Sequence, residues 1–491
     1  MRTVAMLALV VFVLVAYGRT VTFGFVYDDH WTVVQNAKLD EPIFGLLKAV
    51  LAGVGEQRAI PDATRPAMIA SLWLDRRLFG SWAGGYHAHS VLLYTLCCLL
   101  AAALVFAVSR RRAVATVAAI FFAAAPIHAE PVSAVNYRED LIAALGVLAA
   151  LVFLFRRTVR SRPISLIAPT AFFALGLMGK ESAVALVALV LLLLAVRRPT
   201  REWLRTRENA LLGLGSVLIL WSNWRLALRL IGDDVPLAPS QGASATLLDT
   251  ARFEVRAVVS SIWPLGWSPE YPEEGAASVL WLLALFAIIA GAVLLARRRS
   301  TRVAAIGFGW SLLAALPMSP LIGPANARAD RYLFLSVLGG AMIWGVLVDQ
   351  LTQWLPPLAR KVGLALAGAL LLAFAWPAIS IWRNDRTLWS TAVEHTPTSA
   401  RAWTGLSRAL RLSGELDRAD EAVERALELD PGFTYARVTR IYNRLARGDV
   451  EEARRELTLV DQDQLEHPGL PRARRCAALS AREAPGCVRK D

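Results

Sequence analysis

The sequence predicts an all-α protein that crosses a membrane many times and ends in a helical repeat array. Of its 491 residues, 56% are hydrophobic, and the mean hydropathy of +0.45 exceeds that of soluble domains. Apolar runs long enough to cross a bilayer recur through residues 1–382, and short clusters of Arg and Lys separate them. A period of 34 residues in the tail that follows is typical of paired antiparallel helices.

About eleven transmembrane helices are predicted from the apolar runs. The first run follows Met1-Arg2 and resembles a secretory signal, but no small-x-small cleavage site follows it, so we interpret it as an uncleaved span. The eleven runs lie at 4–24, 88–108, 113–128, 140–155, 163–179, 182–196, 209–228, 276–296, 303–320, 332–349 and 362–381.

The basic clusters predict the orientation of these spans. They fall in every second loop, and the positive-inside rule places those loops and the N-terminus in the cytoplasm. The other loops and the C-terminal tail then face the extracytoplasmic side. One outer loop, 229–275, contains an amphipathic stretch that either lies along the membrane surface or enters it as a re-entrant segment. The basic clusters are Arg110–Arg112, Arg156–Arg162, Arg197–Arg207, Arg297–Arg302 and Arg360-Lys361.

The net charge of +13 is not the signature of a nucleic-acid-binding protein. From Arg383 to the end there are 19 basic and 18 acidic residues, a net charge of +1. The remaining +12 therefore lies in the hydrophobic part, in the clusters that set the orientation.

The tail predicts about two and a half tetratricopeptide repeats. Pro397 and Pro431 are 34 residues apart, which is the period of that repeat. Residues fall at the positions where two antiparallel helices pack together: Trp403, Leu406, Gly414, Ala419, Val423 and Ala426 in one unit, and Gly448, Ala453, Leu457 and Val460 one period later. The alternative is a generic helical hairpin. The predicted domains are thus 1–382, the multi-spanning part, 383–465, the repeats, and 466–491, a basic C-terminal tail.

The four cysteines form two groups. Cys97 and Cys98 lie inside an apolar run, where packing is the expected role. Cys476 and Cys487 either form a disulfide, if the tail is extracytoplasmic, or are two unrelated thiols.

The first outer loop opens with a pair of carboxylates, Asp28 and Asp29, directly after the first predicted span. Acids beside hydrocarbon are costly to keep there, and they commonly carry function. The alternative is that the pair only caps the next segment.

Further polar residues collect in the loops predicted to share that side of the membrane. Together they bring carboxylates and cations from several helices to one face, as a site for an anionic lipid head group and a polar acceptor requires. They are Arg65, Tyr86, His87, His89, His128, Glu130, Asn136, Tyr137, Arg138, Glu139, Asp140, Lys180, Glu181, Arg328, Asp330, Arg331 and Tyr332.

Each of these features also has a simpler interpretation. Arg328 and Arg331 could extend to lipid phosphates, and Lys180 with Glu181 could be an ion pair that closes a turn. The histidines lack the His-Glu-x-x-His spacing of a metal site, so we expect hydrogen-bonded histidines and no metal.

Six short motifs occur in an order that is similar to that of a known family. The chain resembles the transmembrane and tetratricopeptide-repeat-containing (TMTC) O-mannosyltransferases and their bacterial relatives, which have the GT-C glycosyltransferase fold. The Ala-, Arg- and Leu-rich composition and the short tail indicate a bacterial member, an integral protein of the inner membrane with its repeats in the periplasm. The motifs are Phe25–Asp29 with Asn36, Arg65-Pro66 with Gly85–His87, Pro126–Glu130 followed by Arg138–Leu141, Gly179–Glu181, Pro264–Pro269 and Arg328–Leu333.

The resemblance implies an inverting hexosyltransferase. A sugar, mannose or another hexose, would move from a polyprenyl phosphate to a hydroxyl of a protein or glycan, with Asp28 or Asp29 as the general base. Asp28 is favoured because the first acid is the base in the related Asp-Glu motifs of protein mannosyltransferases. Arg138, Lys180, Arg331 and Arg328 would bind the donor phosphate. The remaining substrate-site candidates are Arg65, His87, His128, Glu130, Glu139 and Glu181.

No cofactor is then required, because the lipid phosphate already carries the activated sugar. The expected partners are the polyprenyl-phosphate sugar, membrane lipid and an acceptor that docks on the repeats. Two other classes remain open: a transporter or flippase for a lipid-linked sugar, and a non-catalytic membrane scaffold that presents the repeats.

Overall fold

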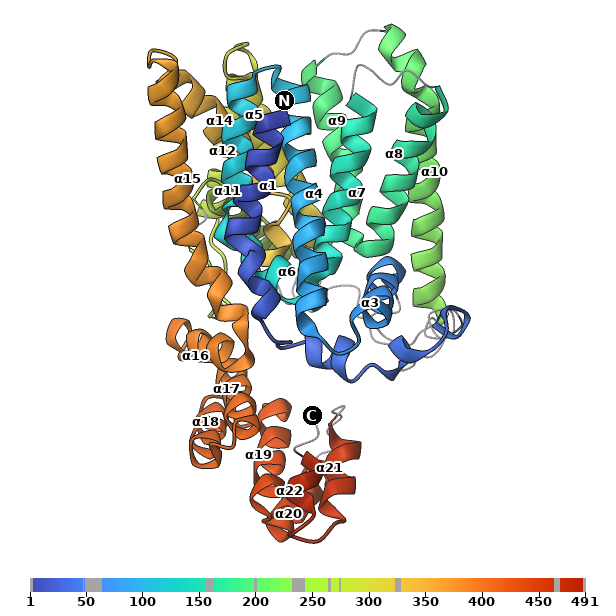
Figure 1. The fold of residues 1–491 in the computed structure, drawn as a ribbon, viewed down its shortest axis with the longest axis vertical. Coiled ribbons are helices and arrows are strands. Elements are labelled where there is room, and N and C mark those ends of the chain that lie inside the picture. The colour runs from blue at the N-terminus through green and yellow to red at the C-terminus, as the bar shows by residue number, and fades with distance from the viewer. Residues whose placement is uncertain are drawn as a thin grey trace. The chain divides into compact units, whose positions relative to one another are not determined.

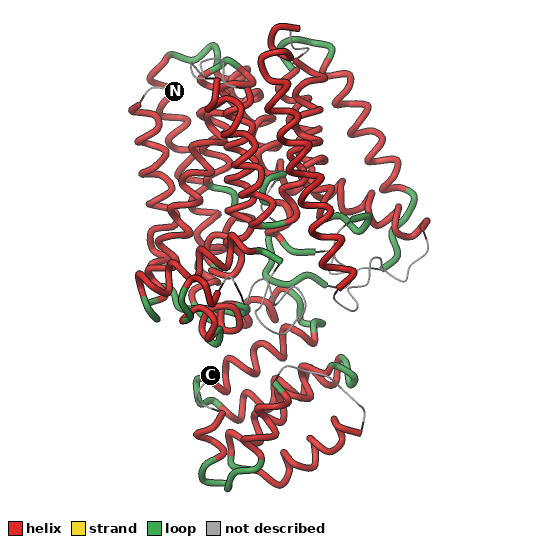
Figure 2. The backbone as a smooth tube through the Cα atoms, turned by 90° about the vertical axis from the view of Figure 1, so that its right-hand side faces the viewer, coloured by secondary structure: helices red, strands yellow, loops and turns green. Residues whose placement is uncertain are grey.

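The structure is a computed structural model of the chain. It describes residues 3–46, 48, 64–155, 162–197, 201–231, 243–263, 266–272, 275–322, 328–462 and 469–488. Throughout these residues the backbone is helical or looped and contains no β-strand (Figure 2), which confirms the predicted all-α class. The chain forms two compact units: unit 1 comprises Met1–Gly24, Trp31–Trp267 and Gly275–Ile379, and unit 2 comprises Phe25–His30, Ser268–Glu274 and Ser380–Asp491.

Unit 1 is a bundle of mostly long helices that run side by side (Figure 1). Its α-helices are α1 (Thr3–Tyr17), α3 (Pro66–Phe79), α4 (Ala83–Ser109), α5 (Arg112–Ala123), α6 (Ala129–Ser133), α7 (Arg138–Phe155), α8 (Arg162–Gly179), α9 (Ala185–Arg197), α10 (Arg201–Ile231), α11 (Ala243–Ile262), α12 (Leu280–Ala296), α13 (Arg302–Ala315), α14 (Val337–Thr352) and α15 (Pro357–Ser380). Short helices join several of them: η1 (Gly18–Thr22), η2 (His30–Val34), η3 (Ala37–Asp40), η4 (Pro126–His128), η5 (Val135–Tyr137), η6 (Glu181–Val184), η7 (Leu316–Met318) and η8 (Asp330–Leu333).

Three helical segments of the described chain are long and apolar enough to cross a membrane: Thr3–Thr22, Ala83–Ser109 and Pro357–Arg383. A fourth results if Arg112–Ala123 and Pro126–Ser133, which are bent by 52°, form one span. Several predicted spans appear as shorter apolar helices; Glu181–Val196, for example, is shorter than the roughly 20 residues that a bilayer requires. The count of eleven spans therefore stays a prediction.

One of these shorter helices, α12, has the surface of a lipid-facing element. It is apolar all round, and none of its residues is buried. Phe286, for instance, is 72% exposed. An apolar helix that leaves such side chains uncovered is suited to hydrocarbon and not to water.

Helix α7 is the most enclosed long helix of unit 1, and glycines bring α8 against it. Nearly all of its residues are buried. A Cβ atom added to Gly146 of α7 would lie 2.5 Å from the carbonyl oxygen of Phe172 and 2.6 Å from Cα of Gly176, both on α8. Small residues at this contact allow the two backbones to approach closely. The contact fixes the start of α7 beside the end of α8, where the charged residues of the candidate site lie.

Basic loops gather at the opposite end of the bundle. Asp349 of α14 pairs with Arg111, which precedes α5, and with Arg360 of α15 at 3.1 Å. Two of the predicted cytoplasmic clusters therefore meet there. Helix α4 has Tyr86 at one end and Arg111 just beyond the other, and its 27 residues rise about 40 Å. Of the other clusters, Arg156 to Ser161 and residues 198–200 lie outside the described residues.

Unit 2 contains the C-terminal helices and two short segments from earlier in the chain, around residues 25–30 and 268–272. The helices of unit 2 are η9 (Ile381–Arg383), α16 (Asp385–His395), α17 (Ala400–Leu412), α18 (Leu416–Leu429), α19 (Thr434–Arg447), α20 (Val450–Gln462), α21 (Leu470–Ala477) and α22 (Ala484–Val488). Helices α17 and α19 begin at residues 400 and 434, and α18 and α20 at 416 and 450, so each pair is offset by 34 residues.

The predicted packing positions of the tail lie in its core. Ala419 and Val423 of α18, and Ala453 and Val460 of α20, are buried. They join apolar clusters between neighbouring helices. The helix offset and this burial agree with tetratricopeptide repeats, whose assignment stays a prediction.

Two features add to the predicted domain division, which stays a prediction. Within the predicted basic tail, 466–491, the helices α21 and α22 pack on α19 and α20, with Leu470 and Val488 in the shared core. Cys476 and Cys487 form a disulfide between these last helices. The packing of residues 25–30 and 268–272 with the C-terminal helices was also not predicted, because no local pattern signals it.

Candidate active site

A buried polar segment leads into α7 in unit 1. Every residue from Pro126 to Asp140 is buried, although the segment contains several charged side chains. Pro126 and Pro131 cannot donate a backbone hydrogen bond, and the segment is broken into η4, α6 and η5 instead of one helix. Buried charges are found where they are paired, and the partners of this segment define the candidate site.

The first cluster, which we call the Lys180 network, comprises Arg65, Glu139, Asp140, Lys180 and Glu181. Lys180 Nζ lies 3.0 Å from a Glu139 oxygen and 2.7 Å from an Asp140 oxygen, and all three side chains are at most 5% exposed. Arg65 pairs with Glu139 and lies 3.2 Å from Glu181. Burial alone would lower the pKa of Lys180, but Asp140 and Glu139 outweigh burial and raise it, so the ammonium stays charged.

A second ion pair lies beside this network. Arg331, in η8, pairs with Glu130 and donates its backbone N–H to the same carboxylate at 3.1 Å. Its guanidinium lies 4.1 Å from the ring centroid of Tyr137 and 4.9 Å from that of Tyr332. Lys180 Nζ lies 5.4 Å from the same Tyr332 ring. The Tyr332 ring is therefore shared by two cations from separate segments of the chain, Lys180 before η6 and Arg331 in η8.

Arg138 has a different environment from the other predicted phosphate ligands. Its side chain is fully buried, with Nη1 2.5 Å from Asp75 and Nη2 donating to the carbonyl of Tyr86 at 2.8 Å. It also donates to the hydroxyls of Ser71 and Ser90. The guanidinium thus ties α7 to α3 and α4, and this geometry favours anchoring over phosphate binding.

The two predicted histidines are hydrogen-bonded inside unit 1. His87 Nε2 lies 3.2 Å from the carbonyl oxygen of Gly24. His128 lies 2.8 Å from the Tyr94 hydroxyl and 3.1 Å from the carbonyl of Phe334, with aromatic rings around it. Both side chains are fully buried. Arg328, by contrast, is exposed.

The acidic pair belongs to unit 2, in a tight turn that we call the acidic turn, residues 26–30. The N–H of Asp29 donates to the carbonyl of Val26 at 2.9 Å, and Asp29 Oδ2 accepts the Val26 N–H at 3.1 Å. Tyr27 has φ of 52°, in the left-handed region that non-glycine residues seldom adopt. Such backbone conformations are concentrated at functional sites.

The turn gives its two carboxylates different roles. Asp29 is fully buried, and its side chain closes the turn through the Val26 N–H. Asp28 is only half-buried. The geometry therefore makes Asp28 the more accessible carboxylate of the two, and its role as the base stays a prediction.

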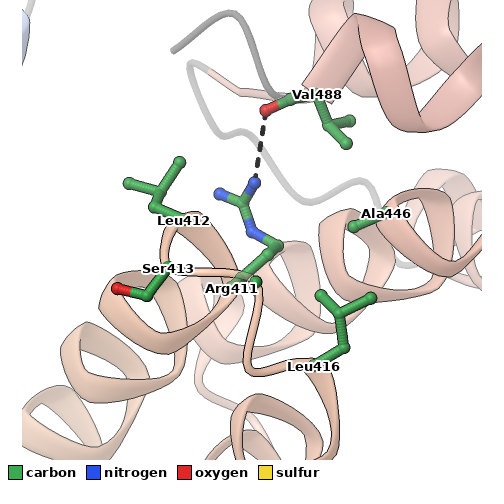
Figure 3. Close-up of a pocket in the computed structure, with 7 residues that line it drawn as sticks. Arg411, Leu412, Ser413, Leu416, Ala446 and Val488 are labelled. Atoms are coloured by element: carbon green, nitrogen blue, oxygen red, sulfur yellow. Dashed lines mark hydrogen bonds between the residues drawn. The ribbon is translucent and has the colours of Figure 1, made fainter.

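A cavity of about 360 Å³ lies elsewhere in unit 2, at the turn between α17 and α18. Figure 3 shows Arg411 pointing toward Val488, whose carbonyl oxygen it reaches at 3.4 Å. Leu416 and Ala446 also line the cavity. None of the residues predicted for the site is among its lining residues.

Two contributors to these clusters were missed from the sequence, and a third, Tyr332, was counted among the polar residues of the site face without a role. Asp75 was not singled out, because no motif or spacing marks it, although it is the buried partner of Arg138. Asp385, which contacts the acidic turn, lies 358 residues from Tyr27, and no local spacing could have revealed it.

The long apolar helices and the buried charge clusters define an all-helical integral membrane protein. A family model described as dolichyl-phosphate-mannose-protein mannosyltransferase matches residues 68–225, less than half of the chain. The matched range contains α7, Lys180 and Glu181, and the match supports a membrane glycosyltransferase of the mannosyltransferase type. A search of curated proteins returned no match to this chain.

Proposed function

We propose that this protein is a GT-C-type membrane glycosyltransferase. It moves a sugar, mannose or another hexose, from a polyprenyl phosphate to a hydroxyl of a protein or glycan on the extracytoplasmic side. The observation that carries the proposal is the acidic turn, in which Asp29 closes the turn and Asp28 is the more accessible acid. The match to a mannosyltransferase family model supports the same chemistry.

The proposed reaction is a single displacement. The acceptor oxygen forms a bond to the anomeric carbon while the bond from that carbon to the phosphate oxygen breaks. Asp28 takes the proton of the acceptor hydroxyl as general base, and the electron pair leaves with the polyprenyl phosphate. One displacement inverts the anomeric configuration.

Cations would stabilise the charge that develops on the departing phosphate. Lys180 and Arg331, which share the Tyr332 ring, are the proposed ligands. The carboxylates around them outnumber the cations, because Arg65, Lys180 and Arg331 are paired with Glu130, Glu139, Asp140 and Glu181. We propose that the one carboxylate in excess accepts hydrogen bonds from the hydroxyls of the sugar, which are donors.

The C-terminal helices are the proposed docking surface for the acceptor. Their 34-residue offset supports a tetratricopeptide array, which presents a concave surface to partners. The disulfide between Cys476 and Cys487 supports an oxidising, extracytoplasmic location for this end of the chain.

The test is a transfer assay on purified protein in nanodiscs. Polyprenyl-phosphate mannose and polyprenyl-phosphate glucose serve as donors, with native extracytoplasmic extract as acceptor. Asp28→Asn should lower transfer by about 10² to 10⁴-fold, the usual contribution of a general base. The matched control is Asp40→Asn, because Asp40 is 65% exposed and lies near the same end of the sequence.

Two results would overturn the proposal. Full activity of Asp28→Asn would remove the proposed base. A folded wild-type protein that binds both donors but turns over neither would favour a lipid-linked-sugar transporter.

A further inference from the structure

Helix α16 begins with an acid that contacts a distant part of the chain. Asn384 fixes the start of the helix. Its side-chain oxygen accepts the backbone N–H of Thr387 at 3.0 Å, and its backbone N–H donates to the Thr387 hydroxyl at 3.3 Å. The next residue, Asp385, uses both of its oxygens elsewhere. Oδ1 accepts the Tyr27 N–H at 2.8 Å, and Oδ2 lies 2.7 Å from His30 Nε2.

The same face of α16 also holds the ring of Tyr27. Trp389 lies one helical turn after Asp385, and its ring meets that of Tyr27 edge-to-face with centroids 5.1 Å apart. Tyr27 has the left-handed φ of 52°, a strained conformation that persists only where the surroundings enforce it. Asp385 and Trp389 supply those contacts, to the backbone and to the ring.

These contacts bracket the acidic pair. Asp385 binds the residue before Asp28 and the residue after Asp29, and its side chain is 14% exposed. We propose that Asp385 and His30 are positioning residues, which hold the acidic turn in the shape that presents Asp28 to the acceptor. The inference rests on the proposed function, in which Asp28 is the base.

The charges around Asp385 and His30 stabilise the contact between these two side chains. Burial alone would raise the pKa of Asp385, but the hydrogen bond and charge of His30, together with the Tyr27 N–H, outweigh burial and lower it. Arg408 of α17 acts in the same direction. The lowered pKa keeps Asp385 ionised near neutral pH, where its two oxygens can accept hydrogen bonds from the Tyr27 N–H and from His30.

Substitutions at Asp385 separate geometry from charge. Asp385→Ala removes both contacts and should lower kcat about tenfold or more with an unchanged KM for the donor, because a misplaced base loses rate and not ground-state binding. Asp385→Asn can still accept the Tyr27 N–H and donate to a neutral His30. Its activity should therefore exceed that of Asp385→Ala and stay within about threefold of wild type, because the amide oxygen still holds the turn through the Tyr27 N–H.

A second readout does not depend on catalysis. Hydrogen exchange at the backbone amide of Tyr27 should be faster in Asp385→Ala than in wild type, since the N–H loses its acceptor. His30→Gln, which keeps a side-chain amide near Asp385, should retain more activity than His30→Ala. The matched control is Asp417→Asn, because Asp417 is paired on the surface of the same unit and is 91% exposed.

The results distinguish this inference from the proposed function. If Asp28→Asn keeps wild-type activity, the proposed function fails, while the exchange of the Tyr27 amide still tests the contact. If Asp385→Ala keeps both the wild-type kcat and the wild-type exchange rate, the positioning role is wrong. It is also wrong if Asp385→Ala and Asp385→Asn lose only folded protein while the kcat of the folded fraction stays at the wild-type value.

Discussion

Replacing Lys180 by Met tests whether the Lys180 network is held together by its charges. Lys180 pairs with Glu139 at 3.0 Å and with Asp140 at 2.7 Å, and its side chain is 2% exposed. Without the ammonium, Glu139 keeps Arg65 as a partner, so Asp140 is the carboxylate that loses its ion pair. Breaking a buried pair from one side costs about 3–5 kcal/mol, and a single orphaned carboxylate places the loss near 3 kcal/mol.

The double variant Lys180→Met, Asp140→Asn removes the orphaned charge as well. Its free energy of unfolding should return to within about 1 kcal/mol of wild type, because a neutral amide is much less costly to bury than an unpaired carboxylate. Its transfer activity should remain lost, because the proposed phosphate ligand is absent. Stability is measured by denaturant titration in detergent, and activity by sugar transfer. The reasoning is refuted if Lys180→Met unfolds at the wild-type denaturant concentration, or if the double variant is no more stable than the single one.

Three further predictions follow from the clusters and the disulfide. Arg331→Gln should lower kcat for transfer about 10²–10³-fold, whereas Arg298→Gln, in an exposed loop at the other end of unit 1, should have little effect; equal losses in the same assay would contradict a role in phosphate binding. Arg138→Met should lower the free energy of unfolding by about 3 kcal/mol or more and leave the donor KM of the folded fraction unchanged; a raised KM at wild-type stability would instead assign Arg138 to the donor. Cys476→Ser should destabilise unit 2 by about 2–3 kcal/mol, and thiol labelling of native wild-type protein at Cys476 or Cys487 would disprove the disulfide.

Much of the fold could be predicted because it depends on local patterns. Hydropathy identified apolar helices, and a 34-residue period anticipated helix starts at 400 and 434. The period ends before residue 466, and the segment beyond it is rich in Arg and Pro. Its helices α21 and α22 are short and depend on contacts with α19 and α20, which local pattern does not encode.

The candidate site was predicted as a set of residues but not as a set of contacts. Loop placement brought Lys180, Glu139 and Arg331 into one group, because residues that end spans on the same side are near each other. The placement of residues in loops could not show that Arg138 donates hydrogen bonds to Asp75 and to the Tyr86 carbonyl. Those contacts depend on which face of α7 packs against α3 and α4. Nor could it distinguish Asp28 from Asp29, whose difference arises from the turn in which they lie.

The 358 residues between Tyr27 and Asp385 have a consequence for biosynthesis. The acidic pair leaves the ribosome well before α16, which emerges only after the long apolar helix α15. A nascent or truncated chain would thus carry both carboxylates without the contacts that shape their turn. If Asp385 acts as proposed, the protein gains activity only when its membrane part is complete, and prematurely terminated chains cannot consume the lipid-linked donor.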